Sequence, residues 1–161
     1  MKKIFLFALC FFIYGCGHYE YTRDKSKAII RTKDYTMFIS DLETNYGLRI
    51  DNLSKYDLEI DWNKTSFIRQ NTTDGGFMFE GIRYMDRNNY KNPTIILSKS
   101  SFYTNIYPNN LAYFSGGQYG SGWVNGKIPD GENGVYLVFK INAKEYREKL
   151  LIKRTTRWVR D

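Results

Sequence analysis

Residues 56–62 carry the pattern that most constrains the fold of this chain. In the segment YDLEIDW, the apolar side chains of Tyr56, Leu58, Ile60 and Trp62 alternate with acidic ones. A strict period of two places successive side chains on opposite faces of an extended strand, whereas a helix needs a period near 3.6. The segment therefore predicts a strand with an apolar face toward a core and an acidic face toward solvent.

Other segments also have strand character, and the stretches between them are rich in the Gly, Asn, Asp and Pro residues that favour turns. These segments are residues 28–40, broken near Lys33 and Asp34, and residues 47–54, 77–85, 94–98, 135–142 and 144–155. Two short connections predict hairpins, one across Ser54 and Lys55 and one across Asn142 and Ala143. Both faces of VYLVFKIN (135–142) are mainly apolar, so we expect a central strand covered on both sides.

Composition favours the same fold class. Of the 161 residues, 17% are aromatic and only 3 are Pro, and aromatic residues suit the pleated, half-buried surface of a sheet. About seven short strands predict an all-β domain over residues 28–161, built as an antiparallel two-sheet sandwich. The position of Trp62 resembles that of the core Trp in immunoglobulin-like domains, although the usual Cys pair is absent. A lipid-binding barrel is the alternative.

The N-terminus has the organisation of an export signal. Lys2 and Lys3 precede the apolar run IFLFALCFFIY (residues 4–14), and small residues follow it. As a helix this run would be about 16 Å long, too short for a hydrocarbon core of about 30 Å. It therefore predicts a processed signal rather than a membrane span.

The residues that follow, Ile13-Tyr14-Gly15-Cys16, resemble the lipobox of bacterial lipoproteins. That resemblance implies a signal peptide over residues 1–15, cleavage between Gly15 and Cys16, and lipid on the Cys16 thiol. Residues 16–27 would then form the lipidated Cys and a tether, and Gly17 after the Cys favours the outer membrane. Secretory cleavage after Gly17 and an uncleaved anchor are the alternatives.

These expectations exclude several kinds of chemistry. Cys10 would leave with the signal and Cys16 would carry lipid, so no thiol would remain for a disulfide, a metal or catalysis. The only histidine, His18, lies in the tether, where no scaffold holds it as a base or zinc ligand. Asp57, Glu59 and Asp61 fit a solvated strand face better than a calcium site, which needs oxygens converging from a loop. We expect no enzyme activity, no metal and no cofactor.

Two segments are candidates for a binding surface. The first is the glycine-rich stretch SGGQYGSGW (115–123), predicted as a loop, with Tyr113, Phe114, Tyr119 and Trp123 in or beside it. The second is the tail KRTTRWVRD (153–161), which gathers Lys153, Arg154, Arg157 and Arg160 around Trp158. The alternatives are aromatic side chains that cap the core and an edge strand protected by charge.

The leading hypothesis is a lipid-anchored, non-enzymatic binding module of the bacterial cell envelope. Its partners would be the membrane, through lipid on Cys16, and an envelope protein or an anionic polymer. Loss of Lys2 and Lys3 with the signal lowers the formal net charge from +7 to +5, and nucleic acid is not an expected partner of an exported protein. A carrier or enzyme with a small hydrophobic pocket and a structural spacer are the alternative functions.

Overall fold

The computed structural model describes residues 19–23, 27–117 and 120–160, and the side chains within 27–116 and 122–155. The expectations for Gly15, Cys16 and His18 concern residues outside these ranges. In the part of the chain that is described, no helix is long and apolar enough to cross a membrane.

Two antiparallel sheets make up the body of the protein. The first has the order β2-β3-β4-β10-β8, with every neighbouring pair antiparallel. Its strands are β2 (Lys27–Arg31), β3 (Tyr35–Asp41), β4 (Tyr46–Asn52), β10 (Ser101–Pro108) and β8 (Phe77–Phe79).

The second sheet is built around the long strand β13 (Gly131–Ile141). β14 (Lys144–Arg154) pairs with one edge of β13 over its whole length. The other edge is shared by β6 (Ser66–Arg69) and β5 (Leu58–Ile60), and β7 (Thr72–Thr73) and β9 (Thr94–Ile96) lie beyond them. The prediction of 135–142 as a central strand is therefore confirmed.

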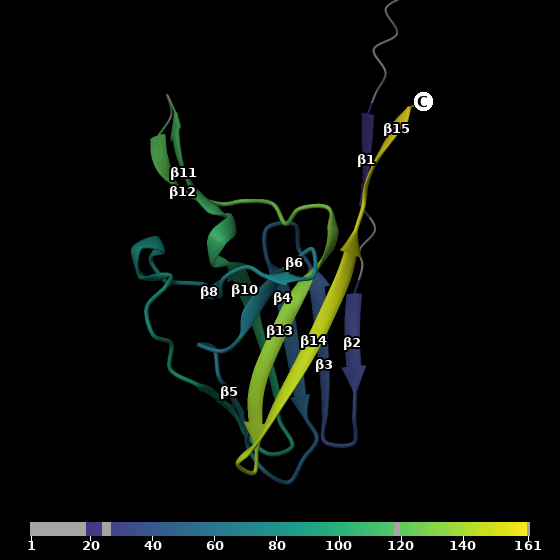
Figure 1. Cartoon of the computed structure of the whole chain (residues 1–161), viewed down its shortest axis with the longest axis vertical. Coiled ribbons are helices and arrows are strands. Elements are labelled where there is room, and N and C mark those ends of the chain that lie inside the picture. Colours follow the sequence, from purple (N-terminus) through teal and green to yellow (C-terminus); the bar gives the residue numbers. More distant parts are fainter. Residues whose placement is uncertain (1–18, 24–26, 118–119, 161) are drawn as a thin grey trace, which may run out of the picture.

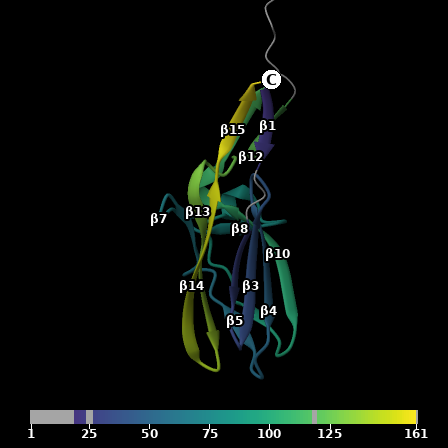
Figure 2. The ribbon, with the colours of Figure 1, turned by 90° about the vertical axis from the view of Figure 1, so that its right-hand side faces the viewer.

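Two further pairs of strands project from the sheets. β11 (Ala112–Gly117) pairs with β12 (Gly120–Asn125), and β1 (Tyr19–Arg23) pairs with β15 (Thr156–Arg160). Figure 1 shows both two-stranded ribbons rising from the same end of the sandwich, and Figure 2 shows the same from the side. Two single 3-10 turns, η1 (Tyr84–Asp86) and η2 (Asn109–Leu111), lie in the connections near this end.

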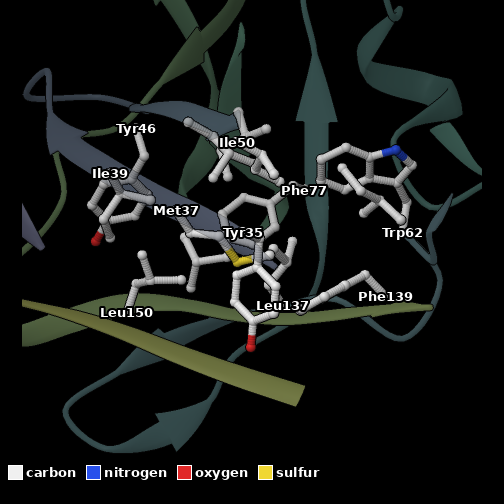
Figure 3. Close-up of a cluster of buried hydrophobic side chains, with 14 of the residues drawn as sticks. Tyr35, Met37, Ile39, Tyr46, Ile50, Trp62, Phe77, Leu137, Phe139 and Leu150 are labelled. Atoms are coloured by element: carbon white, nitrogen blue, oxygen red, sulfur yellow. The ribbon is translucent and has the colours of Figure 1, made fainter. Parts of the chain in front are cut away.

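The hydrophobic core lies between the two sheets. Met37, Ile39, Leu48 and Ile50 of the first sheet and Leu137, Phe139 and Leu150 of the second are all buried in one cluster. Figure 3 shows side chains of β3 and β4 facing those of β13 and β14. Each such side chain contributes about 1.5–3 kcal/mol when fully buried. Trp62 belongs to this core and packs edge-on against Phe79, with ring centroids 4.6 Å apart.

The expectation of an all-β fold with antiparallel sheets is confirmed, and the described residues form two packed sheets rather than a closed lipid-binding barrel. They contain strands β1 to β15, more than the number expected. β10 lies in a segment that the sequence pattern did not single out. Residues 19–23, placed in the tether by the sequence, form β1.

The predicted hairpin between 47–54 and 56–62 is wrong. β4 pairs with β3 and β10, whereas β5 pairs with β13 and β9 in the other sheet, so the short connection crosses between sheets. Buried Asn52 holds this crossing: its Nδ2 donates to the carbonyls of Tyr56, Ile96 and Leu97 at 2.9–3.1 Å. Tyr56, expected on the apolar face, is 41% exposed because it belongs to the crossing.

The second predicted hairpin is confirmed and supplies a test of the fold. Asn142 and Ala143 join β13 to β14 with φ of 50° and 62°. An alanine is strained in this left-handed region, whereas glycine is not. We expect Ala143→Gly to raise the free energy of unfolding by about 1 kcal/mol, as measured by urea denaturation.

The matched control is Ala28→Gly in β2, where glycine adds freedom to the unfolded chain and removes a methyl group that packs against the core. This substitution should lower the free energy of unfolding by about 0.5–1 kcal/mol. A loss of stability in both variants would contradict the turn geometry.

Candidate functional site

The β11–β12 ribbon exposes large apolar side chains. Tyr113, Phe114, Trp123 and Val124 have exposed fractions of 54%, 57%, 49% and 42%. Phe114 lies opposite Trp123 and Tyr113 lies opposite Val124, so the two pairs occupy opposite faces of the ribbon. Large apolar side chains exposed on both faces of one ribbon are typical of an interaction site.

Trp123 is part of a stack formed by aromatic rings and a guanidinium group. Its ring lies nearly parallel to that of Tyr84, with centroids 3.3 Å apart at 12°, and the Phe114 ring meets it edge-on at 5.5 Å. The guanidinium carbon of Arg87 lies 3.8 Å from the centre of the Tyr84 ring on η1. We call Tyr84, Arg87, Phe114 and Trp123 the aromatic cluster.

Hydrogen bonds fix the η1 side of the aromatic cluster. The backbone carbonyl of Arg87 accepts from Nδ2 of buried Asn109 and from Nζ of Lys91, both at 2.8 Å. Asn63 and Lys91 exchange two further hydrogen bonds, which tie the segment after η1 to the turn that follows β5. Burial lowers the pKa of the Lys91 ammonium below its ordinary value. Arg87 and Tyr84 are therefore held in place by the body of the protein.

The base of the ribbon is fixed as well. The Tyr84 hydroxyl donates to the carbonyl of Ala112 at 3.2 Å, and the Gly126 amide donates to the carbonyl of Leu111 at 2.8 Å. The backbones approach so closely here that a Cβ at position 126 would lie 2.4 Å from the Leu111 oxygen. Only glycine fits at this position, which explains its place directly after β12.

Two pockets flank the chain between β8 and η1. One, of about 310 Å³, lies beside the aromatic cluster and is lined in part by Phe79, Tyr84 and Trp123. The other, of about 430 Å³, is lined largely by apolar groups, among them Trp62, Phe79, Ile82, Tyr90 and Phe102. Volumes of this size are within the range of small-molecule sites.

Of the residues that the sequence proposed for a binding surface, Phe114 and Trp123 come together on one face of the ribbon, and Tyr113 is exposed on the other face. The stretch predicted as a loop is instead the two strands β11 and β12. Tyr119 lies outside the described residues. Arg157, Trp158 and Arg160 belong to β15, whose backbone pairs with β1 but whose side chains are also outside the described part.

Arg154 corrects the prediction of an exposed basic tail. Its side chain is only 5% exposed, and its Nη1 donates to the carbonyls of Glu43 and Ile128 at 3.1 and 2.5 Å. Asp41 and Asp130 lie 3.8 Å from its guanidinium group. Arg154 is buried because it links the loop after β3 to the segment before β13, so it does not belong to a binding surface.

The acidic side chains of residues 56–62 make hydrogen bonds and an ion pair that stabilise the fold. The Asp57 carboxylate accepts from the Ser98 amide, Asp61 accepts from the Asn63 amide, and Glu59 lies 3.8 Å from the Lys140 ammonium. Among the described residues, no group of three or more His, Cys, Asp or Glu side chains could hold a metal ion.

Buried Tyr35 donates to the Glu148 carboxylate, and burial together with this bond raises the pKa of the Tyr35 hydroxyl. That pair joins β3 to β14.

The sequence did not predict a role for Tyr84 and Arg87. The prediction of a strand over 77–85 holds only for β8 (Phe77–Phe79), because Tyr84 lies on η1. Nothing in the segment GIRYMDRNNYK (81–91) indicated that Tyr84 stacks on another ring. Its high content of Tyr and Arg was the one available signal. The stack depends on a ribbon more than thirty residues further along the chain, which local patterns cannot reveal.

Comparison with protein-family models, with curated proteins and with solved structures finds no match to this chain. Inferences about its function therefore rest on the geometry of the chain itself.

A double-mutant cycle tests the Tyr84–Trp123 stack. We expect the effects of Tyr84→Ala and Trp123→Ala on the free energy of unfolding to be coupled by about 0.5–1.5 kcal/mol, the energy of an aromatic pair. The matched control pairs Tyr84→Ala with Tyr113→Ala, whose side chain lies on the other face of the ribbon, and its coupling should be near zero. Equal coupling in the two cycles would contradict the stack.

Proposed function

We propose that this protein is a lipid-anchored, non-enzymatic binding module of the bacterial cell envelope and that the aromatic cluster is its contact surface. The observation that carries the proposal is Trp123, about half exposed yet stacked on Tyr84. A side chain held in place while still accessible loses little conformational entropy when it binds.

The chemistry of the aromatic cluster supports binding. Aromatic rings supply large contact areas, and Trp, Tyr and Arg are the residues most enriched at the energetic centres of interfaces. The Arg87 guanidinium adds a positive charge that would attract an anionic partner. No side chain of the cluster is an activated nucleophile or a carboxylate pair, the groups on which most hydrolytic chemistry depends.

The anchor is proposed from the lipobox resemblance around Cys16. Two or more acyl chains hold a protein stably at a membrane, because each buried CH₂ contributes about 0.8 kcal/mol. Gly17 favours the outer membrane as the location. The partner would be another component of the envelope.

An immunoglobulin-like topology is also part of the proposal. It is supported by the packing of buried Trp62 in the core of two antiparallel sheets. Extra short strands such as β7 and β9 would then be additions at the edge of the second sheet.

A small hydrophobic-ligand carrier is the second candidate function. The pocket of about 430 Å³ bounded by Trp62, Phe79, Tyr90 and Phe102 favours it. A lipid that co-purifies with the wild-type protein, and is lost when Phe102→Trp fills the pocket, would support a carrier. A protein without such a ligand would favour the binding module.

In-cell photocrosslinking tests the binding module most directly. A photoreactive amino acid replaces Phe114 in the aromatic cluster, and in a second variant it replaces Tyr103 of β10, which is similarly exposed but lies outside the cluster. We expect a specific adduct at position 114, identified by mass spectrometry, and at least a tenfold lower yield at position 103.

A further control is Cys16→Ser, whose intact mass should lack the lipid found on the wild type. The same substitution should abolish the adduct at position 114, because the protein would leave its membrane. An absence of any specific adduct at 114 in a lipid-bearing protein would contradict the binding module and favour a spacer. A wild-type protein without lipid would contradict the anchor.

A further inference from the structure

The longest stretch of the chain without a charged residue runs from Ser100 to Gly126 and contains the whole β11–β12 ribbon. Lys, Arg, Asp and Glu make up 25% of the sequence, so such a stretch is unusual here. Exposed strand edges are commonly protected by charged side chains or by Pro. Among the strands that the structure describes, β11 pairs only with β12, and neither strand carries a charged residue or Pro. An uncharged ribbon with exposed aromatic side chains suits surroundings that are less polar than bulk water.

The position of the ribbon in the molecule indicates that these surroundings are close to a membrane. Figure 1 shows the β11–β12 ribbon and the β1–β15 ribbon extending past the sandwich at the same end and to a similar level, and Figure 2 agrees. Tyr19, the first residue of β1, follows Cys16 by three residues. Three extended residues span at most about 10 Å. If Cys16 carries lipid, the end that bears both ribbons must therefore stay close to the bilayer.

We propose that the β11–β12 ribbon rests in the headgroup layer of the bilayer leaflet that holds the lipid on Cys16, as a second and non-covalent membrane contact. This inference rests on the proposed lipid anchor and names the partner of the aromatic cluster. The contact fixes which way the sandwich stands on the membrane, because a single point of attachment cannot do so and two separated contacts can.

The side chains of the ribbon suit this layer. Trp and Tyr concentrate at the membrane–water interface, where an apolar ring and a polar group are both accommodated. Tyr113, Phe114 and Trp123 are all about half exposed and therefore available to lipid. The Arg87 guanidinium, which lies over the Tyr84 ring at the base of the ribbon, is suited to pair with anionic headgroups at the outer edge of the layer.

The depth of the contact follows from the backbone. The outer edges of β11 and β12 carry amides and carbonyls that no other described strand satisfies. Open sheet edges do not occur in the hydrocarbon region, where no water can bond them. Water is present among the headgroups, so the ribbon is stable there and does not enter the hydrocarbon core.

Fluorescence quenching tests the inference on the full, acylated chain in vesicles of phosphatidylethanolamine and phosphatidylglycerol. Part of the phospholipid carries a nitroxide on its headgroup. Trp158→Phe is introduced first, which leaves Trp123 as the exposed reporter because Trp62 is buried in the core. We expect strong quenching of the emission, and we expect Trp123→Phe to remove the quenched component.

A matched pair of charge substitutions controls for folding and for the anchor. Phe114→Glu places a charge beside Trp123 and should abolish the quenching, while the protein still floats with the vesicles. Tyr103→Glu places the same charge on β10, near the other end of the sandwich, and should leave the quenching intact.

The outcomes separate the two proposals. An acylated protein that floats with the vesicles without quenching of Trp123 would overturn the membrane contact and leave the anchored binding module standing. An envelope protein crosslinked at position 114, again without quenching, would also overturn it. A chain that carries no lipid and does not float would contradict the anchor itself.

Discussion

The burial of β13 at the centre of the second sheet is the constraint on which the rest of this structure depends. Val135, Leu137, Phe139 and Ile141 point into the core, and the backbone of the same strand pairs with β14, β5 and β6. Residues 17–161 contain no cysteine, so no disulfide can link the sheets. The fold is therefore held by apolar packing against one strand and by the hydrogen bonds along its edges. Gly134 shows how tight the packing is, because a Cβ there would lie 1.9 Å from the Leu150 carbonyl oxygen.

The proposed function belongs to a part of the molecule that this core does not include. The aromatic cluster draws on η1 and on β11 and β12, and none of its side chains lies in the buried cluster. Asn109 and Lys91 connect it to the sheets through polar contacts. Binding surfaces are often built this way, on segments positioned by a rigid scaffold but free to vary independently of it.

The sequence predicted the elements whose pattern is local. Strict alternation identified β5, and a short turn with apolar flanks identified the β13–β14 hairpin. The pairing of 47–54 with 56–62 failed because a short connection does not reveal whether the chain stays in one sheet or crosses to the other. The β11–β12 ribbon was predicted as a loop because glycine lowers strand propensity, although its backbone still pairs in register.

The functional residues, too, could be predicted only where the signal in the sequence is local. Phe114 and Trp123 could be proposed from sequence because aromatic residues among glycines suggest exposure. Tyr84 and Arg87 could not, because their role arises only where η1 meets the ribbon. Arg154 was misplaced because a count of charges in the tail does not show that Asp41, Asp130 and two carbonyls surround it.

Amide hydrogen exchange, resolved to single residues, tests most directly the claim that stability and binding lie in separate parts of the protein. The account predicts that amides of β13 exchange only through global unfolding, so that their opening free energy equals the free energy of unfolding. Amides of β11 and β12 should open at a clearly lower free energy, because few buried apolar contacts hold the ribbon. Ribbon amides as strongly protected as those of β13 would contradict the account, since the aromatic cluster would then be part of the cooperative core.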